Sequence, residues 1–552
     1  MYAEDHRLRL IALATPKEAW VFPYETFGLA INLVPLLQSK LLIMHNASYD
    51  VQVLDHHIGG GIENWWRQTR DTKILAHQID PRGRDEGGIG QSLEELVKYY
   101  IPQYAKLGDD LKDEFKRLKQ SGAIRKSATF ADMWRELPID NELYNIYAGT
   151  DAILTARLFQ DFREKVDINS DLTKMDHKVA MIATKMDAKG FALDEEYTTK
   201  LRDELLLEEA DWKEVAKGWG LENINSPQQV ADTLFKYGIV PTDKTPKGNP
   251  KVDKNFLKAH EDHQLVTAII EGKKAGKWRT TWVEKFLQST DASGRVHPST
   301  NTLRARTARF SITGIPAQTL PAKDSLVRSC FVADTGECIV GVDYSNQELR
   351  FAAAMAPDAR MIRAFRTGEN LHEITASVAF PGMDVHKGTP YYDLGKMGNF
   401  AVGYGAGVSG LVRQGMTQQQ AVAVRNGIKK AYRGMAALSD RLKAEAGRKG
   451  YITTWTGRRL PVDADREYAA FNYYIQSGCR DITARAMIRL YDAGFVDNMR
   501  LAIHDEILFS LPNDAEMIRE IVGLMSTKVG TLDLPAEAKI GSRSWGSLYD
   551  KA

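Results

Sequence analysis

Apolar and polar residues alternate in short blocks along the first part of the chain. The blocks RLIALAT, AWVFP and KLLIMH fall within residues 8–45, and turn residues separate them. Short apolar runs bounded by turn residues are typical of strands. Residues 92–100 and 141–162 instead have helical spacing, and residues 105–135 are charged with weak periodicity. We therefore expect an N-terminal α/β domain with an exposed excursion at residues 105–135.

The pattern changes after residue 163. It is mainly helical to about residue 290, apart from the polar loop PTDKTPKGNPKVDK at residues 241–254. Strand-like runs then appear at CIVGVDY (338–344) and LAIHDEILFSL (501–511), with a largely helical stretch at residues 347–450 between them. This order predicts a second, α+β region in which strands lie on either side of a long helical insertion.

Composition narrows the class of protein. The chain has 552 residues, of which 43% are hydrophobic and 26% charged, a balance typical of several globular domains. No apolar run reaches the length of a membrane span, and the N-terminus lacks a signal-peptide cleavage pattern. The three cysteines, Cys330, Cys338 and Cys479, form no CxxC pair. This disfavours a disulfide framework or zinc site and favours a reducing cytoplasm without membrane attachment.

Charge is distributed unevenly along the chain. The net charge is only +1, yet residues 273–309 contain nine basic and two acidic residues, a local net charge of +7. Such a run is often a solvated helix face. Because it leads directly into the segment with the strongest catalytic pattern, we interpret it as a phosphate-binding surface.

Two strand-like runs carry carboxylates. Asp343 follows CIVGV, and Asp505 with Glu506 lies between LAIH and ILFSL. Each alone would be an ordinary strand-end residue, but a carboxylate among apolar residues needs a partner. Magnesium prefers such oxygen ligands, and two aspartates on adjacent strands can hold two ions roughly 3.5–4 Å apart.

A third pattern lies between these strands, in YYDLGKMGNFAVGYGAG (391–407). Lys396, Phe400 and Tyr404 recur every four residues and so share one helical face. A cation and two rings suit a nucleoside triphosphate, although a half-buried packing face is the commoner explanation of such a stripe. The glycines permit close approach of neighbouring elements.

These segments resemble the motifs of family A DNA polymerases. DYSNQELR (343–350), KMGNFAVGYG (396–405) and HDE (504–506) are similar to motifs A, B and C. NYYIQSGCRD (472–481), TARFS (307–311) and QTLP (318–321) are similar to three further motifs, and all six occur in the family's order. The resemblance covers roughly residues 170–552. It implies a right-hand polymerase domain at 166–552, with a thumb at about 166–300, a palm at about 301–355 and 451–552, and fingers at about 356–450.

The resemblance also implies roles for individual residues. Asp343, Asp505 and the Tyr344 carbonyl would bind two Mg²⁺ ions, which Mn²⁺ could replace, with Glu506 in support. Lys396 would act as the general acid toward the leaving pyrophosphate, and Glu348 would exclude a ribose 2′-hydroxyl. The residues implied in nucleotide binding are Tyr344, Ser345, Gln347, Glu348, His372, Lys396, Phe400 and Tyr404. Those implied in binding primer–template DNA are Lys277, Arg304, Arg309, Gln318, Asn472, Gln476 and His504.

One position departs from the family pattern. The family usually has an arginine four residues before Lys396, where this chain has Tyr392. Lys387 or His386 could substitute for it. We expect weaker binding of the incoming nucleotide.

Residues 1–165 resemble a ribonuclease H-like 3′–5′ exonuclease domain of the DEDD type with a tyrosine in its third motif. HNASYD (45–50) and IYAGTDAILT (146–155) match its second and third motifs, which implies functional roles for Asn46, Asp50, Tyr147 and Asp151. The first motif, DxE on the opening strand, is absent, since Glu4 and Asp5 are adjacent and would point to opposite faces of a strand. We therefore expect little proofreading.

The overall expectation is a monomeric DNA polymerase that uses dNTPs. No 5′-nuclease segment precedes the exonuclease-like domain, which favours a phage-type enzyme in its host's cytoplasm. A single-subunit RNA polymerase, a nuclease and a catalytically inactive DNA-binding scaffold are the alternatives. Glu348 and the exonuclease-like domain argue against the first, and the complete set of motifs argues against the other two.

Overall fold

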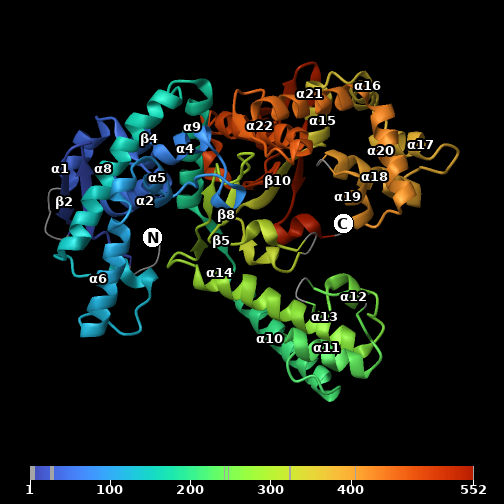
Figure 1. Ribbon diagram of the computed structural model, residues 1–552, viewed down its shortest axis with the longest axis horizontal. Coiled ribbons are helices and arrows are strands. Elements are labelled where there is room, and N and C mark those ends of the chain that lie inside the picture. The colour runs from blue at the N-terminus through green and yellow to red at the C-terminus, as the bar shows by residue number, and fades with distance from the viewer. Residues whose placement is uncertain are drawn as a thin grey trace.

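The computed structural model describes residues 6–24, 30–241, 243–245, 248–321, 325–403 and 406–550, without the side chains of residues 30–33, 107, 400, 402 and 403. Figure 1 shows an N-terminal α/β domain on one side and a small sheet at the centre, with a helical lobe below and a second helical group on the far side. No helix in these ranges is long and apolar enough to cross a membrane.

The N-terminal domain contains two short pairs of strands. β1 (Leu10–Ala14) and β2 (Ala19–Pro23) form an antiparallel hairpin, and β3 (Leu42–Met44) runs parallel to β4 (Thr69–Asp71). Helix α8 (Glu142–Lys165) packs against β1, β2 and β3. Around them lie α1 (Ala30–Gln38), α2 (Ala47–Ile58), α3 (Ile62–Arg67), α4 (Thr72–Ile79) and α5 (Leu93–Tyr100). The strands and helices predicted before residue 165 are therefore present.

The expected exposed excursion is more ordered than its sequence suggested. Residues 105–135 include the 15-residue helix α6 (Leu107–Ser121) and the short helix α7 (Met133–Glu136). Leu111, Phe115 and Leu118 recur along one face of α6 and are buried together with Met133 and Tyr144. The many charges on the other face of this helix masked its apolar side.

The helical lobe is built from two long helices and their connections. α9 (Asp171–Lys189) leads to α10 (Glu195–Gly218), which packs along α13 (Gln264–Lys277). α13 continues through a π-helical turn (Trp278–Val283) into α14 (Glu284–Gln288). α11 (Pro227–Lys236) and α12 (Lys254–Lys258) cap the tip, and the described residues from 238 to 253 form no helix or strand, as the sequence predicts.

A four-stranded antiparallel sheet forms the centre, in the order β13-β14-β10-β17. Its strands are β10 (Cys338–Tyr344), β13 (Met499–Ile503), β14 (Glu506–Leu511) and β17 (Ala536–Ile540). β10 is buried along most of its length, which explains its continuous apolar sequence. Helices α15 (Gln347–Met355), α22 (Ala470–Asp492) and α23 (Ala515–Met525) pack around the sheet.

Short strands complete the region. β5 (Phe191–Leu193), β6 (Arg295–Val296) and β9 (Phe331–Val332) form one sheet. Three further pairs are β7 (Ser299–Asn301) with β8 (Ser311–Thr313), β11 (Tyr451–Thr453) with β12 (Arg459–Pro461), and β15 (Thr527–Val529) with β16 (Leu532–Leu534).

The long insertion between β10 and β13 includes a helical group formed by α16 (Ala359–Thr367), α17 (Leu371–Ala379), α18 (Pro390–Gly403), α19 (Val408–Arg413), α20 (Gln418–Ala431) and α21 (Arg433–Lys449). Two glycines let α17 and α20 approach α18 closely. A Cβ at Gly395 would lie 2.6 Å from the His372 carbonyl oxygen, and one at Gly398 would overlap Val424. This agrees with the close approach that the glycine pattern predicts.

Candidate active site

The strand register brings the predicted carboxylates together. Asp343 on β10 lies directly opposite Glu506 on β14, so their side chains share one face with Cβ atoms about 4.5–5.5 Å apart. His504 and Asp505 form the two-residue loop between β13 and β14, in which His504 has a left-handed φ of 59°. A Cβ at Gly341 would lie 2.5 Å from the Glu506 Oε1 atom, so this glycine leaves room for the Glu506 side chain.

Burial and mutual repulsion disfavour the charged forms of these carboxylates. Burial and the charge of Asp505 raise the pKa of Asp343 to about 6. Burial and the charge of Asp343 raise the pKa of Glu506 to about 7, and burial also raises the pKa of Asp505. Lys539 on β17 lies opposite Gly341, on the same sheet face, and partly offsets these shifts. Sequence reasoning missed Lys539, since only the third strand's register places it here.

This donor set fits a magnesium ion. No three acidic, histidine or cysteine side chains in the described ranges form a complete metal cage. Magnesium needs no such cage, because it commonly binds one or two carboxylates and takes its remaining ligands from water and substrate phosphates. Clustered carboxylates with raised pKa values have the oxygen chemistry and uncompensated charge that such an ion would satisfy.

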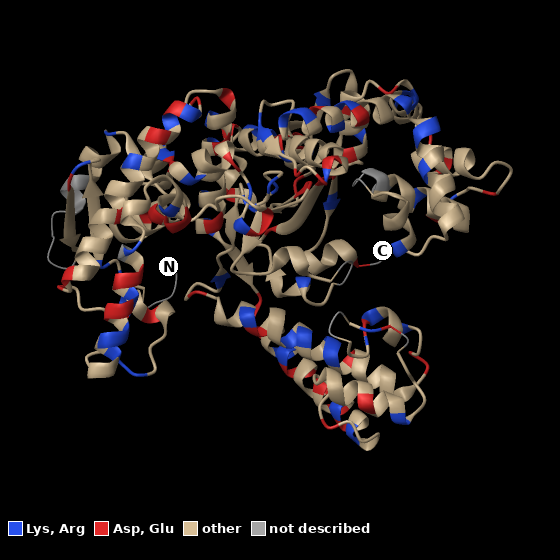
Figure 2. Cartoon of the chain, viewed as in Figure 1, with Lys and Arg blue, Asp and Glu red and all other residues tan. Residues whose placement is uncertain are grey.

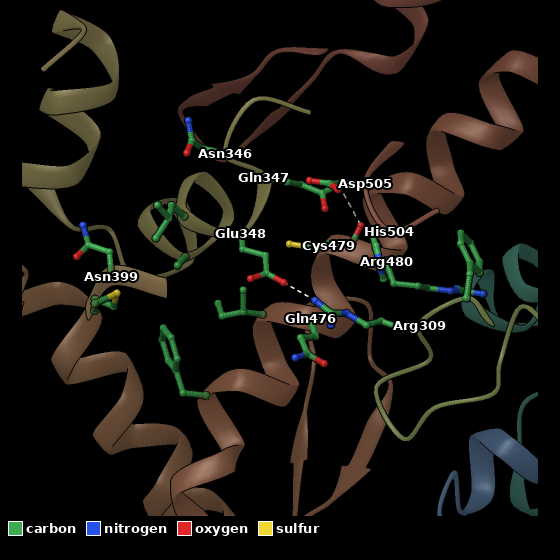
Figure 3. A pocket seen from close by; sticks show the side chains of 16 residues that line it. Arg309, Asn346, Gln347, Glu348, Asn399, Gln476, Cys479, Arg480, His504 and Asp505 are labelled. Carbon is green, nitrogen blue, oxygen red and sulfur yellow. Dashed lines mark hydrogen bonds and ion pairs between the residues drawn. The ribbon is translucent and has the colours of Figure 1, made fainter. Parts of the chain in front are cut away.

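A cavity of about 310 Å³ opens beside these residues. Figure 3 shows Glu348 and Arg309 pointing toward each other within it, and the two side chains form an ion pair. Gln476, His504 and Asp505 also line the cavity.

Gln347 lines it too but is buried, and its amide donates to the Cys479 carbonyl and the Thr483 hydroxyl. Tyr344 is buried, with its hydroxyl donating to the Met525 carbonyl. Ser345 donates its backbone N–H to the Pro535 carbonyl.

The helix α18 presents Lys396 as an exposed side chain. Burial, followed by the charge of Lys396, lowers the pKa of His372, which places these two groups near each other. Asn399 fixes the helix, since its amide donates to the Leu371 carbonyl and bonds to the His372 ring while accepting from the Thr375 hydroxyl. The Phe400 side chain and Tyr404 lie outside the described residues, so the predicted three-residue face is described only at Lys396.

Tyr392 does not offer a charge to a nucleotide. It is 7% exposed, and its ring meets the His372 ring edge-on at 5.9 Å. His386 and Lys387 are exposed, and the His386 ring lies 4.0 Å from the Glu373 carboxylate.

The predicted DNA-binding residues fall into two groups. Lys277 and Arg304 are exposed cations. The less exposed ones bond within the chain: Arg309 pairs with Glu348, the Gln318 amide bonds to the backbone of Ile312 and Phe310, and Gln476 donates to Asn472. His504 is exposed and lines the cavity. Basic and acidic residues are interspersed along the lobe of α10 and α13 (Figure 2).

The basic run has less free charge than its sequence suggested. Arg279 pairs with Glu209 and Glu284, Arg295 pairs with Asp334, and Arg306 pairs with Glu86 and Asp463. The +7 count therefore overstates the charge available to phosphates.

A buried ionic cluster forms part of the cavity wall, since its member Arg480 is a lining residue. Asp176 on α9 accepts from Arg458 and Arg480, and both guanidinium groups also reach Asp481. All four side chains are 0–1% exposed. Arg480 also donates to the Thr302 carbonyl, so the cluster joins α9, α22 and the loop that carries Arg309. Sequence reasoning missed it because the partners are hundreds of residues apart.

The exonuclease-like residues lie in two different settings. Tyr147 and Asp151 are hydrogen-bonded, and they line a cavity of about 170 Å³ with Glu94 and Trp134. Burial raises the pKa of Asp151 to about 6. Asp50 does not line this cavity, and burial together with the charge of Asp71 raises its pKa to about 7.

Asn46 has a separate partner. Its side chain accepts from Lys73, which also bonds to Asn301. Glu4 and Asp5 lie outside the described residues.

The arrangement of a carboxylate-bearing central sheet between a helical lobe and a helical insertion defines a right-hand nucleic-acid polymerase. The model of "DNA polymerase family A" matches residues 191–547, and the model of "3'-5' exonuclease" matches residues 1–167. The chain belongs to DNA polymerase family A.

Two relatives and one solved structure illustrate this membership. The DNA polymerases of Mycobacterium phages L5 and D29 are each 40% identical, over 100% of this chain and 91% of the phage protein. A structure titled "POL domain of Pol1 from M. smegmatis complex with DNA primer-template and dNTP" has a TM-score of 0.76 at 23% identity, covering 97% of this chain and 92% of that one. It supports the fold.

Proposed function

We propose that the chain is a template-directed DNA polymerase that adds deoxynucleotides to a primer 3′ end with two Mg²⁺ ions, or Mn²⁺ in their place. The supporting observation is the convergence of Asp343, Asp505 and Glu506 from two strands and a turn, beside the cavity that Glu348 and Arg309 share. Primer–template DNA and dNTPs are its proposed substrates, bound by a monomer.

Asp343 and Asp505 would hold the ions, with the Tyr344 carbonyl and with Glu506 in support. When bound, the ions supply charge neutralisation and activation of the primer hydroxyl for in-line attack on the α-phosphate. Lys396 neutralises the triphosphate from the α18 side and donates a proton to the leaving pyrophosphate, and His372, whose lowered pKa favours its neutral form, lies beside it near the incoming phosphates.

Glu348 closes the sugar side of the cavity against a 2′-hydroxyl. Glu348 forms an ion pair with Arg309, so a contact of Arg309 with the primer–template minor groove would compete with this pair. Arg309, Gln476 and His504 line the cavity and are placed to test pair shape, since minor-groove acceptors occur in every correct pair.

Primer extension with the variants Asp343→Asn and Asp505→Ala tests this function. We expect each to lose at least about a hundredfold in rate, since each removes charge where the transition state needs it. Glu516→Gln is a control, because Glu516 is an exposed carboxylate at the start of α23 and does not act on the pKa of Asp343. Undiminished extension by Asp343→Asn would contradict the assignment. If the parent chain binds primer–template DNA but extends no primer, it is the catalytically inactive DNA-binding scaffold instead.

The same assay with rNTPs separates a DNA from an RNA polymerase. We expect dNTP incorporation to dominate in the parent chain. The variant Glu348→Ala should admit rNTPs, while a parent chain that prefers rNTPs would favour the alternative.

For the N-terminal domain, we propose that 3′–5′ hydrolysis is weak. Different carboxylates raise the pKa values of Asp50 and Asp151, namely Asp71 and Glu94, and Asp50 is not among the residues that line the Asp151 cavity. Incubation of a mispaired primer with Mg²⁺ and no dNTP tests this. Efficient shortening that Asp151→Ala abolishes would overturn it.

A further inference from the structure

A second cavity lies away from the polymerase site, where the N-terminal domain meets α9. It measures about 460 Å³ and is lined by residues of α3, β4, α9 and the end of α22. We call it the junction cavity. Its size is within the range of pockets that hold small organic ligands.

The junction cavity is strongly basic. Arg67, Arg70, Lys174 and Lys178 line it, and Glu63 is the one carboxylate among its described lining residues. Glu63 is bound by Lys185, and Lys178 is bound to Asp492.

Three of these cations form no ion pair with a carboxylate among the described residues, although the charge of Arg67 acts on Glu63. Arg67 donates to the neutral Asn64 amide and Arg70 to the Thr69 carbonyl. Among the described ion pairs, neither these arginines nor Lys174 has a carboxylate partner. The cavity therefore attracts an anion.

A buried donor without a partner supports the same conclusion. Trp66 lines the junction cavity and is 5% exposed, yet its indole N–H has no hydrogen-bond partner in the described part of the chain. The indole N–H can only donate, so it needs an acceptor atom. Nearby side chains do not supply one to it.

His177, which packs edge-on against Trp66, has both ring nitrogens engaged. Its Nε2 atom accepts from the Asp71 backbone N–H, which leaves Nδ1 to donate to the Thr173 carbonyl. Burial lowers the pKa of His177, in agreement with this neutral form.

We propose that the junction cavity is a binding site for a phosphate-bearing ligand of nucleotide size. The guanidinium groups of Arg67 and Arg70 match phosphate oxygens, Lys174 adds a third charge, and Trp66 supplies a neutral donor. The phosphate belongs either to a free nucleotide or to a nucleotide within a single strand of DNA. This site is separate from the polymerase cavity and does not depend on the function proposed for it.

Two probes distinguish the sources. Calorimetric titration with dAMP and fluorescence anisotropy with labelled 12-residue oligo(dT) are carried out on the full chain with a saturating hairpin primer–template. Binding of both probes assigns the phosphate group itself as the ligand, and binding of oligo(dT) alone assigns a single strand. If neither probe binds with a Kd below about 1 mM, the proposal is wrong.

Variants connect any binding to this cavity. Arg70→Ala/Lys174→Ala should weaken the bound probe at least about tenfold and reduce the salt dependence of oligo(dT) binding, while primer extension is unchanged. Trp66→Phe removes the N–H together with part of the buried ring, so it should weaken binding roughly tenfold and also lower the melting temperature.

The control Lys116→Ala/Lys165→Ala removes two exposed cations of the same domain and should bind as the parent does. Equal affinity of the parent and the Arg70→Ala/Lys174→Ala variant would overturn the proposal.

Discussion

The two buried aspartates of α9 should respond in opposite ways to the same substitution. Asp176 and Asp187 are 0% and 4% exposed and lie eleven residues apart, about three turns of one helix. Asp176 accepts from two arginines, whereas Asp187 accepts only from the backbone N–H and hydroxyl of Thr300. Replacing each with asparagine separates charge pairing from burial.

The magnitudes follow from these partners. Burial alone would raise the pKa of Asp176, but Arg458 and Arg480 outweigh it and hold the pKa below its usual range. Asp176→Asn leaves Asp481 as the counter-charge of two buried guanidinium groups and places an amide N–H against their donors. Breaking such a pair typically costs about 3–5 kcal/mol.

Asp187 has the opposite balance. Burial raises its pKa to about 7, although the Thr300 bonds lower it. A raised pKa means that its contribution to stability is full below the unfolded pKa near 4 and is lost as pH rises through about 7. The difference of about three in pKa corresponds to roughly 4 kcal/mol at pH 8. Asp187→Asn removes this penalty while keeping an acceptor for Thr300, so we expect about 1–3 kcal/mol of stabilisation.

Urea unfolding followed by circular dichroism at pH 8 compares the two variants. With a slope of about 3 kcal/mol per molar urea, Asp176→Asn should lower the midpoint by about 1 M, and Asp187→Asn should raise it. The gain from Asp187→Asn should shrink as pH falls from 8 to 5. If both variants lost similar stability, or if Asp176→Asn shifted the midpoint by less than about 0.3 M, the reasoning from charge pairing would be refuted.

Three further outcomes follow from the site. Gly478→Ala should destabilise the chain by about 1–3 kcal/mol or more, because its Cβ would overlap the buried Phe351 ring; thermal melting measures this, and Gly447→Ala, with open space around it, should be neutral or stabilising. The Mg²⁺ concentration for half-maximal nucleotide incorporation should rise about tenfold between pH 8 and pH 6, because protons compete for Glu506 and Asp343, whose pKa values are about 7 and 6; a flat profile would count against these ligands. Tyr392→Arg should lower the KM for dNTPs several-fold at similar kcat in steady-state extension, and an unchanged KM would show that this position does not limit nucleotide binding.

Local patterns predicted the elements better than the contacts between them. The apolar run of β10 and the apolar residues on both sides of HDE are each typical of strands. The sequence therefore predicted that Asp343 and Asp505 lie at strand ends. Helix α6 was missed because its charged face dilutes the apolar periodicity of Leu111, Phe115 and Leu118. Lys539 carries no signature, since its place beside the carboxylates depends on the pairing of β17 with β10.

The N-terminal domain supports the polymerase fold independently of any hydrolytic activity. Ala47 and Val51 of α2 are buried in the same apolar cluster as Val179 and Ile182 of α9. Gln78 of α4 donates to Asp176, the carboxylate that neutralises Arg480 in the wall of the polymerase cavity. Because Arg480 in turn bonds to the backbone ahead of Arg309, the position of α4 bears on the loop that carries Arg309. Even with a weakened nuclease site, the N-terminal domain would therefore still stabilise the polymerase domain through its contacts with α9.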